Sequence, residues 1–363
     1  MSQEKTSTRT PWAKVILVSL VVLALGLAVL ELAFGSWLRP VRLNRLNLLR
    51  DREIRYEVEG LYETAHAYTL YRRDGYGFRG PYPSVSDIDI LTLGGSTTDQ
   101  RHIHEGETWQ DVLSEDFAAH GRTVSVVNAG IDGQSTYGHI KNFTWWFPSV
   151  EGMKARYCLV FVGINDFYKD DDAERDDLLR HGEGSAVGAI KERSAIYHLY
   201  RVLKGIHAAE LQHGLSHTKV DFGSLQWTSI PIAVDYDALM KERLDGYRKR
   251  LTILLEAIRE SGAAPILVTQ RSMKYKLVGG QVLGVTDTED YAGLAINGVD
   301  YYHMLSRLNR ETREACQPSD CLFLDLAVEL DLSEGDFYDF NHTNPAGCKK
   351  IGDYLYAKLQ HLF

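Results

Sequence analysis

Short apolar runs alternate along the chain with longer segments whose apolar residues recur every three or four positions. Five of these runs have the length and composition of buried strands: residues 88–93, 124–128, 158–162, 265–269 and 321–326. The segment before the fourth run has helical periodicity, with apolar residues at Leu244, Tyr247, Leu251, Leu254 and Ile258. Strands that alternate with helices predict a three-layer α/β/α sandwich around a five-stranded parallel sheet.

The most apolar stretch lies near the N-terminus. Residues 15–30 contain no charged side chain, and continuation to Phe34 gives about 20 residues, or about 30 Å of helix, which matches a bilayer core. A cleaved signal peptide usually has a shorter apolar core and a small-residue cleavage site, so we expect an uncleaved transmembrane anchor at residues 15–34. Residues 1–14 are then a cytoplasmic tail.

A basic stretch follows the predicted anchor. Residues 38–55 interleave leucines with arginines, which predicts an amphipathic helix that lies on anionic headgroups, packs on a partner or serves as a plain linker. We therefore assign residues 35–73 to a juxtamembrane helical linker and residues 74–363 to the main domain. The third and fourth strands are separated by far more chain than one crossover helix needs, so residues 168–232 are expected to form an insertion or lid.

The charge of the chain bears on its partners. The net charge is −9, and the lysines and arginines form no long run. Proteins that bind nucleic acid usually present a basic surface, so this composition predicts no nucleic-acid partner.

Ser96 follows Gly94 and Gly95 where the first predicted strand ends. A strand that ends in this way turns sharply into a helix, which leaves the serine hydroxyl clear of the sheet and its N–H near the positive end of the helix. This arrangement suits a nucleophile, although similar turns bind phosphate or serve only the fold. The interpretation therefore depends on the residues that accompany the serine.

A serine nucleophile requires a base, and the base requires a carboxylate that orients it. Asp339 and His342 provide both near the C-terminus. Asn344 and Pro345 follow as the expected cap and first residue of a helix, which would hold the preceding loop in place. We therefore expect a catalytic role for Ser96, Asp339 and His342.

Acyl transfer also needs hydrogen-bond donors for the developing oxyanion. Gly130 follows the second predicted strand and Asn165 follows the third. Because the carboxyl ends of parallel strands share one edge of a sheet, both are expected to converge on Ser96. This chemistry needs no metal or cofactor, and His102 and His104, which lack a third ligand, are assigned to a loop.

Four segments together resemble the SGNH or GDSL hydrolase family: Gly94-Gly95-Ser96-Thr97, Asn128-Ala129-Gly130, Gly163-Ile164-Asn165-Asp166 and Asp339-Phe340-Asn341-His342. The resemblance covers roughly residue 74 to the C-terminus and implies a flavodoxin-like sheet and a Ser-His-Asp triad. It also implies an oxyanion hole made by the N–H groups of Ser96 and Gly130 and the side chain of Asn165.

One position departs from the best-known members of the family, which have Asp where this chain has Gly95. The variant looks like a membrane-anchored bacterial branch that also carries a Gly-Phe-Arg-Gly stretch, found here at residues 77–80. We interpret that stretch as a docking loop.

The resemblance implies a membrane-anchored serine esterase or acyltransferase that acts on O-acyl esters. The expected substrate is an acylated cell-envelope glycan, and a multispanning acyl-donor protein is an expected partner. The alternative is a catalytically silent subunit that serves as a binding or assembly component of a membrane complex. The presence of every catalytic residue type favours the enzyme.

The orientation of the domain is not decided by charge, because basic residues flank the apolar stretch on both sides. The size of the domain and the family resemblance favour an inner-membrane protein whose domain faces the periplasm. Cys316 and Cys321 are close enough in sequence to form a disulfide in such an oxidising compartment, and two reduced thiols are the alternative.

Overall fold

The computed structural model describes residues 12–35, 37, 43, 46–66, 68–168, 178, 194–197, 199–200, 217–317 and 320–363. The chain divides into two units, one made of Leu46–Leu178 with Leu215–Phe363 and one made of Met1–Arg45 with Leu179–Gly214. Most of the predicted tail and most of the predicted insertion at residues 168–232 lie outside the described residues.

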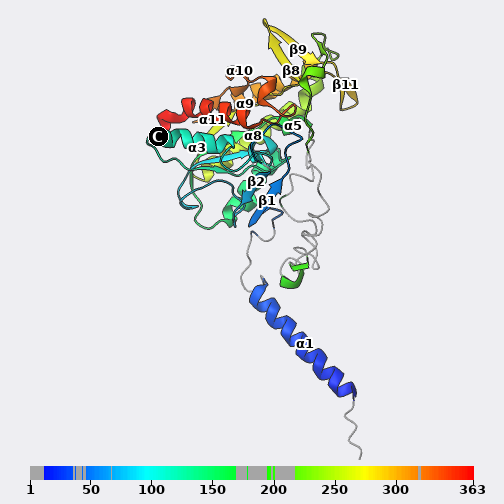
Figure 1. Ribbon diagram of the computed structural model, residues 1–363, viewed down its shortest axis with the longest axis vertical. Helices are drawn as coiled ribbons and strands as arrows, with labels where there is room; N and C mark the ends of the chain where they lie inside the picture. Colours follow the sequence, from blue (N-terminus) through cyan, green and yellow to red (C-terminus); the bar gives the residue numbers. More distant parts are fainter. Residues whose placement is uncertain are drawn as a thin grey trace, which may run out of the picture. The chain divides into compact units, whose positions relative to one another are not determined.

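A five-stranded parallel sheet forms the centre of the larger unit (Figure 1). Its strands are β3 (Ile88–Gly94), β4 (Val126–Asn128), β5 (Ala155–Phe161), β7 (Ala264–Val268) and β12 (Leu322–Leu324). The order β12-β7-β5-β3-β4 places the first of these strands between the second and the third, which is the flavodoxin-like arrangement. The predicted fold class is confirmed, and the ends of the predicted strands are shifted by only a few residues.

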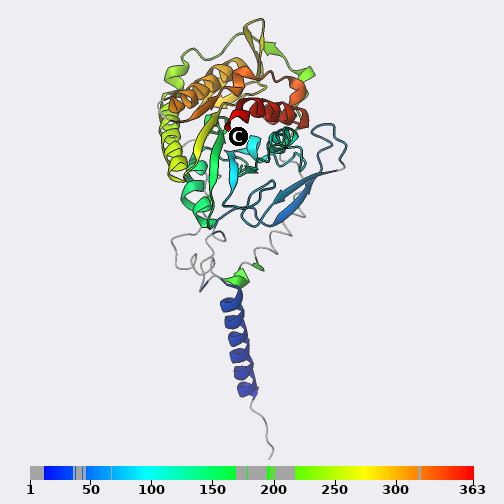
Figure 2. The ribbon, with the colours of Figure 1, turned by 90° about the vertical axis from the view of Figure 1, so that its left-hand side faces the viewer.

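Helices cover both faces of this sheet (Figure 2). On one face α3 (Trp109–Ala119) packs against α11 (Pro345–Leu359). The other face carries α4 (Thr136–Lys141), α8 (Tyr236–Glu260) and α9 (Gly298–Cys316), and α8 contacts both of its neighbours. The three layers are those that alternating strands and helices predict.

Side chains of the central strands alternate between the two layers, as the geometry of a strand requires. Ile90 and Leu159 belong to the core that also includes Trp109 of α3 and Ile351 of α11. Their neighbours Leu91 and Cys158 point to the layer that contains α8. Both faces are therefore apolar, which explains why the strands are continuous apolar runs.

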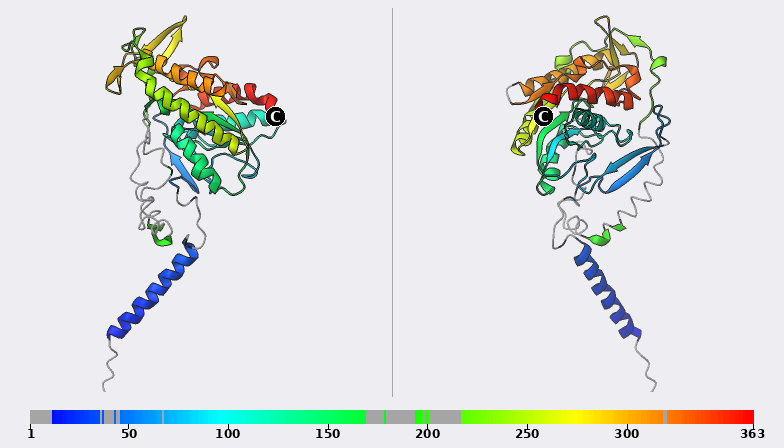
Figure 3. Two further views of the ribbon diagram at one scale, coloured as in Figure 1. Left: turned by 180° about the vertical axis from the view of Figure 1, so that it is seen from behind. Right: turned by 60° about the vertical axis from the view of Figure 1, so that its left-hand side comes forward.

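The remaining elements of the larger unit are short. Three helices follow strands or loops at the carboxyl edge of the sheet: α2 (Ser96–Asp99), α5 (Ile164–Tyr168) and α10 (Leu326–Glu329). Irregular helical turns are η2 (Asn142–Trp146), η3 (Phe147–Ser149), η5 (Phe222–Ser224), η6 (Glu334–Asp336) and η7 (Gln360–Leu362). Figure 3 shows further strands apart from the parallel sheet: β6 (Trp227–Thr228), β8 (Tyr275–Val278), β9 (Gln281–Val285), β10 (Glu289–Tyr291) and β11 (Leu294–Ile296).

The predicted helical linker is wrong over the described part of residues 46–73. Two antiparallel strands, β1 (Arg52–Tyr56) and β2 (Thr69–Arg73), lie there, and the compact unit begins at Leu46 instead of residue 74. The physical reason is that successive side chains of β2 point to opposite sides. Tyr71 and Arg73 are therefore buried together, while Arg72 between them stays exposed.

The N-terminal unit contains α1 (Trp12–Phe34). Its segment Lys14–Phe34 has a mean hydropathy of 2.8 and exposed side chains, so the helix is long and apolar enough to cross a membrane. A signal sequence would have the same properties. Near the end of α1, Glu31 accepts hydrogen bonds from the Ser194 hydroxyl at 2.6 Å and the Ala195 N–H at 2.9 Å.

The cysteines follow the expected pattern. A disulfide joins Cys316 at the end of α9 to Cys321 before β12, and the alternative of two reduced thiols does not apply in this structure. Cys158 and Cys348 are free thiols, and both are buried.

Candidate active site

Ser96 is the first residue of α2 and follows β3 after a single residue, Gly95. The turn is tightly enclosed. A Cβ on Gly94 would lie 2.6 Å from the carbonyl oxygen of Phe161, and a Cβ on Gly95 would overlap the Asn165 amide nitrogen. Only glycine fits at these two positions without a shift of the neighbouring groups.

The structure brings Ser96 together with the two C-terminal residues that the sequence singled out. The Ser96 hydroxyl lies 2.7 Å from His342 Nε2. On the other side of the ring, Nδ1 of His342 lies 2.7 Å from Oδ2 of Asp339. With Nδ1–H donated to the carboxylate, Nε2 presents its lone pair to the hydroxyl, which is the arrangement of a general base next to a nucleophile.

Asp339 is held in its ionised form. Burial alone would raise the pKa of this carboxyl, but the hydrogen bonds from the His342 side chain and from the N–H groups of Asn341 and His342 outweigh burial, and the net pKa lies below its usual value. The two N–H groups donate to Oδ1 at 2.8 and 2.7 Å. The carboxylate is therefore fixed in orientation as well as in charge.

A second histidine, His217, lies against the imidazole of His342. Its ring stacks on that of His342 with centroids 4.1 Å apart, and its Nδ1 lies 2.8 Å from the Tyr338 hydroxyl. Burial, assisted by the neighbouring His342, lowers the pKa of His217 to about 4, so the ring is neutral at pH 7. The sequence offered no signal for this contact, because His217 lies in the predicted insertion, 125 residues before the histidine that it covers.

Asn165 lies in α5, beside the nucleophile turn. Its Nδ2 donates to the carbonyl oxygen of Gln134 at 2.8 Å, and the same nitrogen occupies the space beside Gly95. A primary amide has two N–H groups, and this contact uses one of them. Behind Asn165, the buried Asp166 accepts hydrogen bonds from Thr136 and Arg250, which ties α5 to α4 and α8.

The geometry does not support Gly130 as an oxyanion donor. Gly130 is buried, and its N–H donates to Oδ1 of Asn128 at 2.8 Å. A Cβ at this position would overlap the backbone N–H of Asp99, so the glycine is needed for packing behind α2. Sequence reasoning chose the first glycine after β4, whereas the backbone that lies beside Gly95 is that of Gln134, the residue after Gly133.

Gln270 is a site residue that the sequence reasoning missed. Its Nε2 donates to Thr97 Oγ1 at 2.8 Å, and its Oε1 accepts the Ile164 N–H at 2.7 Å. The side chain is buried and bridges the residue after Ser96 to the residue before Asn165. A signal was present, because Gln270 comes two residues after β7 at the same edge of the sheet.

Two buried arginines hold the loops behind the nucleophile. Arg73 of β2 pairs with Asp99 and donates to the carbonyl oxygens of Asn128 at 3.1 Å and Gly130 at 2.6 Å. Arg79 belongs to residues 77–80, the predicted docking loop. It donates to the carbonyl oxygens of Asp99 and Gln100, both at 2.8 Å. These contacts connect β2 and the docking loop to the end of α2 and to the segment after β4.

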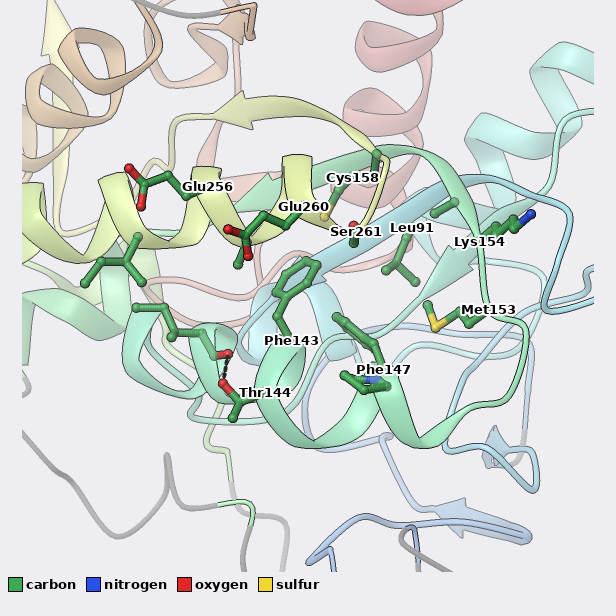
Figure 4. A pocket seen from close by; sticks show the side chains of 16 residues that line it. Leu91, Phe143, Thr144, Phe147, Met153, Lys154, Cys158, Glu256, Glu260 and Ser261 are labelled. Atoms are coloured by element: carbon green, nitrogen blue, oxygen red, sulfur yellow. Dashed lines mark hydrogen bonds between the residues drawn. The ribbon is translucent and has the colours of Figure 1, made fainter.

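A pocket of about 510 Å³ lies elsewhere, between α8 and the turns after α4 (Figure 4). Phe143, Phe147 and Met153 contribute apolar side chains, while Glu256 and Glu260 lie on the α8 side. Ala155, the first residue of β5, also lines it. The pocket therefore lies over the face of the sheet that α8 covers, and it extends from the middle of β3 and β5 to the amino end of β5.

A model of the GDSL-like lipase/acylhydrolase family matches residues 92–350. No curated protein matches the chain. Among solved structures, a lipase/acylhydrolase from Enterococcus faecalis is 13% identical with a TM-score of 0.41, and the match covers 76% of this chain and 97% of that chain.

Two further solved structures show the same level of similarity. A member of the lipolytic protein G-D-S-L family from Veillonella parvula is 14% identical with a TM-score of 0.40, over 76% of this chain and 98% of that chain. An acetyl xylan esterase named AlAXEase is 14% identical with a TM-score of 0.42, over 75% of this chain and 100% of that chain.

The match to the family spans most of the chain and includes the segments that carry Ser96, Asn165 and His342. The chain therefore belongs to the GDSL-like lipase/acylhydrolase family.

Proposed function

We propose that this protein is a membrane-anchored serine esterase or acyltransferase that acts on O-acyl esters of a cell-envelope glycan. Membership of the family supports ester hydrolysis in general. The observation that carries the proposal for this chain is the contact of 2.7 Å between Ser96 Oγ and His342 Nε2, because it provides both a nucleophile and the base that activates it.

In the proposed reaction, Ser96 Oγ attacks the ester carbonyl while His342 Nε2 takes the hydroxyl proton. Asp339 stabilises the resulting imidazolium and holds its orientation. His342 then protonates the leaving alcohol, and an acyl-enzyme remains on Ser96. Attack by water completes hydrolysis, whereas attack by a second hydroxyl transfers the acyl group, and the exclusion of water decides between the two outcomes.

Stabilisation of the oxyanion is assigned to the backbone N–H of Ser96 and the side chain of Asn165. Because the N–H of Gly130 is directed to Asn128, we assign the remaining backbone donor to Gly133. Support comes from the position of the next residue, Gln134, whose carbonyl oxygen contacts Asn165 Nδ2 beside the nucleophile turn. Removal of one donor from such a site typically costs about 10²- to 10³-fold in kcat.

The anchor and the compartment rest on separate observations. The apolar α1 supports a single span at residues 15–34, and the Cys316–Cys321 disulfide supports an oxidising periplasm for the main domain. A fusion of alkaline phosphatase to the C-terminus tests the orientation, since that reporter is active only after export. Its inactivity in a stably expressed fusion would place the domain in the cytoplasm.

The activity is tested with purified full-length protein in detergent and p-nitrophenyl acetate as substrate. We expect a Ser96→Ala variant that melts like the parent protein to lose at least about a thousandfold in turnover, the order seen for triad knockouts. Unchanged turnover would remove Ser96 from the mechanism. Acetylated glycans then replace the simple ester, with released acetate and transferred acetyl measured separately.

The alternative is a catalytically silent subunit of a membrane complex, which would need no activated serine. A fluorophosphonate probe distinguishes the two, because it labels a serine that is accessible and activated. Labelling of the parent protein and its loss in Ser96→Ala would favour the enzyme. A folded parent protein that remains unlabelled would favour the silent subunit.

A further inference from the structure

His217 has contacts at the site that the reaction described above does not use. Its ring stacks on the His342 imidazole, with centroids 4.1 Å apart and planes 26° from parallel. Its Nδ1 lies 2.8 Å from the Tyr338 hydroxyl and 3.9 Å from Oδ2 of Asp339. The ring therefore covers one face of His342, while the edge of His342 is hydrogen-bonded to Ser96 and Asp339.

The segment that carries His217 is itself held in place. Residues 217–222 lie along the loop that ends in His342, and the N–H of Val220 donates to the Tyr338 carbonyl oxygen at 2.9 Å. The ring of His102 contacts that of His217 edge to face, with centroids 4.8 Å apart. Only 14% of the His217 side chain is exposed. These contacts fix the position of the His217 ring.

The charge of His217 decides what the stacked contact does. Burial, assisted by the neighbouring His342, lowers the pKa of His217 to about 4, so this ring is neutral at pH 7. The imidazole of His342 becomes a cation when its Nε2 takes the proton of Ser96. The face of a neutral aromatic ring carries negative potential and attracts a cation within about 6 Å. The His217 ring is thus placed to stabilise the imidazolium that the reaction forms.

We propose that His217 is a positioning residue of the esterase, whose ring holds the His342 imidazole in the plane that faces Ser96 and stabilises the imidazolium by stacking. The inference rests on the proposed function, since it concerns one step of that reaction. The proton moves from Ser96 Oγ to His342 Nε2 and then to the leaving alcohol. No bond to His217 forms or breaks.

Two substitutions separate the ring from the rest of the side chain. His217→Phe retains a flat aromatic face, whereas His217→Leu fills similar space without one. Both remove Nδ1, the partner of the Tyr338 hydroxyl, so both should lower Tm. With p-nitrophenyl acetate, we expect His217→Leu to lower kcat about 10-fold with little change in KM, and His217→Phe to stay within about threefold of the parent protein.

His66→Leu is the matched control. His66 stacks on His104 with centroids 3.9 Å apart, and its Nε2 lies 3.0 Å from Oε1 of Glu107. The substitution thus removes one ring of a histidine stack outside the triad, and kcat should not change. The rate at which a fluorophosphonate labels Ser96 is a second measure, and it should follow the same order as the kcat values.

The outcomes are distinct. Loss of kcat in His217→Leu but not in His217→Phe, at similar Tm, would support positioning by the ring face. Equal kcat in the parent protein and His217→Leu would overturn it, and so would equal losses in the two variants. His217→Gln, which lacks the ring but can still bond to Tyr338, replaces a leucine variant that does not fold.

The proposed function is tested by the parent protein in the same assays. A parent protein without esterase activity would refute that function and this inference with it. An active parent protein together with an unaffected His217→Leu variant would refute this inference alone.

Discussion

The side chain of Gln270 bridges to Thr97, with Nε2 of the amide 2.8 Å from the threonine Oγ1. The carbonyl oxygen of the same amide accepts the N–H of Ile164 at 2.7 Å. One buried residue after β7 thus fixes the distance between the nucleophile turn after β3 and the Asn165 turn after β5. The hydrogen bonds of the Gln270 amide go to residues next to Ser96 and Asn165, so Gln270 is assigned as a positioning residue.

We expect Gln270→Leu to lower kcat by about 10- to 100-fold with a smaller change in KM, because slight misplacement of catalytic groups is costly to the chemical step. Steady-state kinetics with p-nitrophenyl acetate measure both constants. Gln281→Leu, at an exposed position of β9, is the control. Equal changes in the two variants would contradict a positioning role.

Gly95→Ala tests the close approach of Asn165 to the nucleophile turn. The added Cβ would overlap the Asn165 amide, so the amide must move, and we expect kcat to fall by about 10²-fold, as for loss of one oxyanion donor. Gly335→Ala is a suitable control, since its Cβ would meet only Ser333 Oγ at an ordinary 3.8 Å. A Gly95→Ala enzyme with full kcat would show that Asn165 is not needed at its observed position.

Asp339→Asn tests the orientation of the base. The amide cannot stabilise an imidazolium and favours the wrong tautomer of His342, so we expect kcat to fall by about 10⁴-fold while the fold persists. Labelling of Ser96 by a fluorophosphonate should slow in parallel. Asp353→Asn, a surface change in a pair with Lys349, should leave both rates as they are.

Arg73→Met tests the buried contacts behind the site. The substitution leaves Asp99 as a buried charge without its main partner, and such a loss typically costs about 3–5 kcal/mol in the free energy of unfolding. The neighbouring Arg72→Met removes only an exposed pair with Glu53, for which about 0–1 kcal/mol is expected. Denaturant unfolding measures the free energy of unfolding of the two variants. Similar losses in both would argue against a buried pair of Arg73 with Asp99.

The Cys316–Cys321 disulfide closes a short loop. For a loop of this size the entropic treatment gives about 2 kcal/mol of stabilisation. We expect the double variant Cys316→Ala/Cys321→Ala to unfold at lower denaturant by a corresponding amount. Titration of thiols in the denatured, unreduced protein should detect only Cys158 and Cys348. Detection of all four would show that the bond does not form.

The sequence by itself determined the layers of the fold, the positions of Ser96 and Asn165 at one edge of the sheet, and the pairing of Asp339 with His342. The reason is local. Apolar periodicity marks each strand, and the carboxyl ends of parallel strands meet at one edge, so a polar residue just after a strand is placed there by the topology alone. Asp339 and His342 are close in the chain, so their contact needed no long-range information.

Only the tertiary structure decided the contacts between segments that are distant in the chain. It directed the N–H of Gly130 to Asn128, paired β1 with β2 where a helix was expected, and placed His217 on His342. The pattern of apolar residues specifies which face of an element is buried, but not which side chain another segment will bring to that face. Those choices depend on packing across the whole domain, where each buried polar group must find a partner.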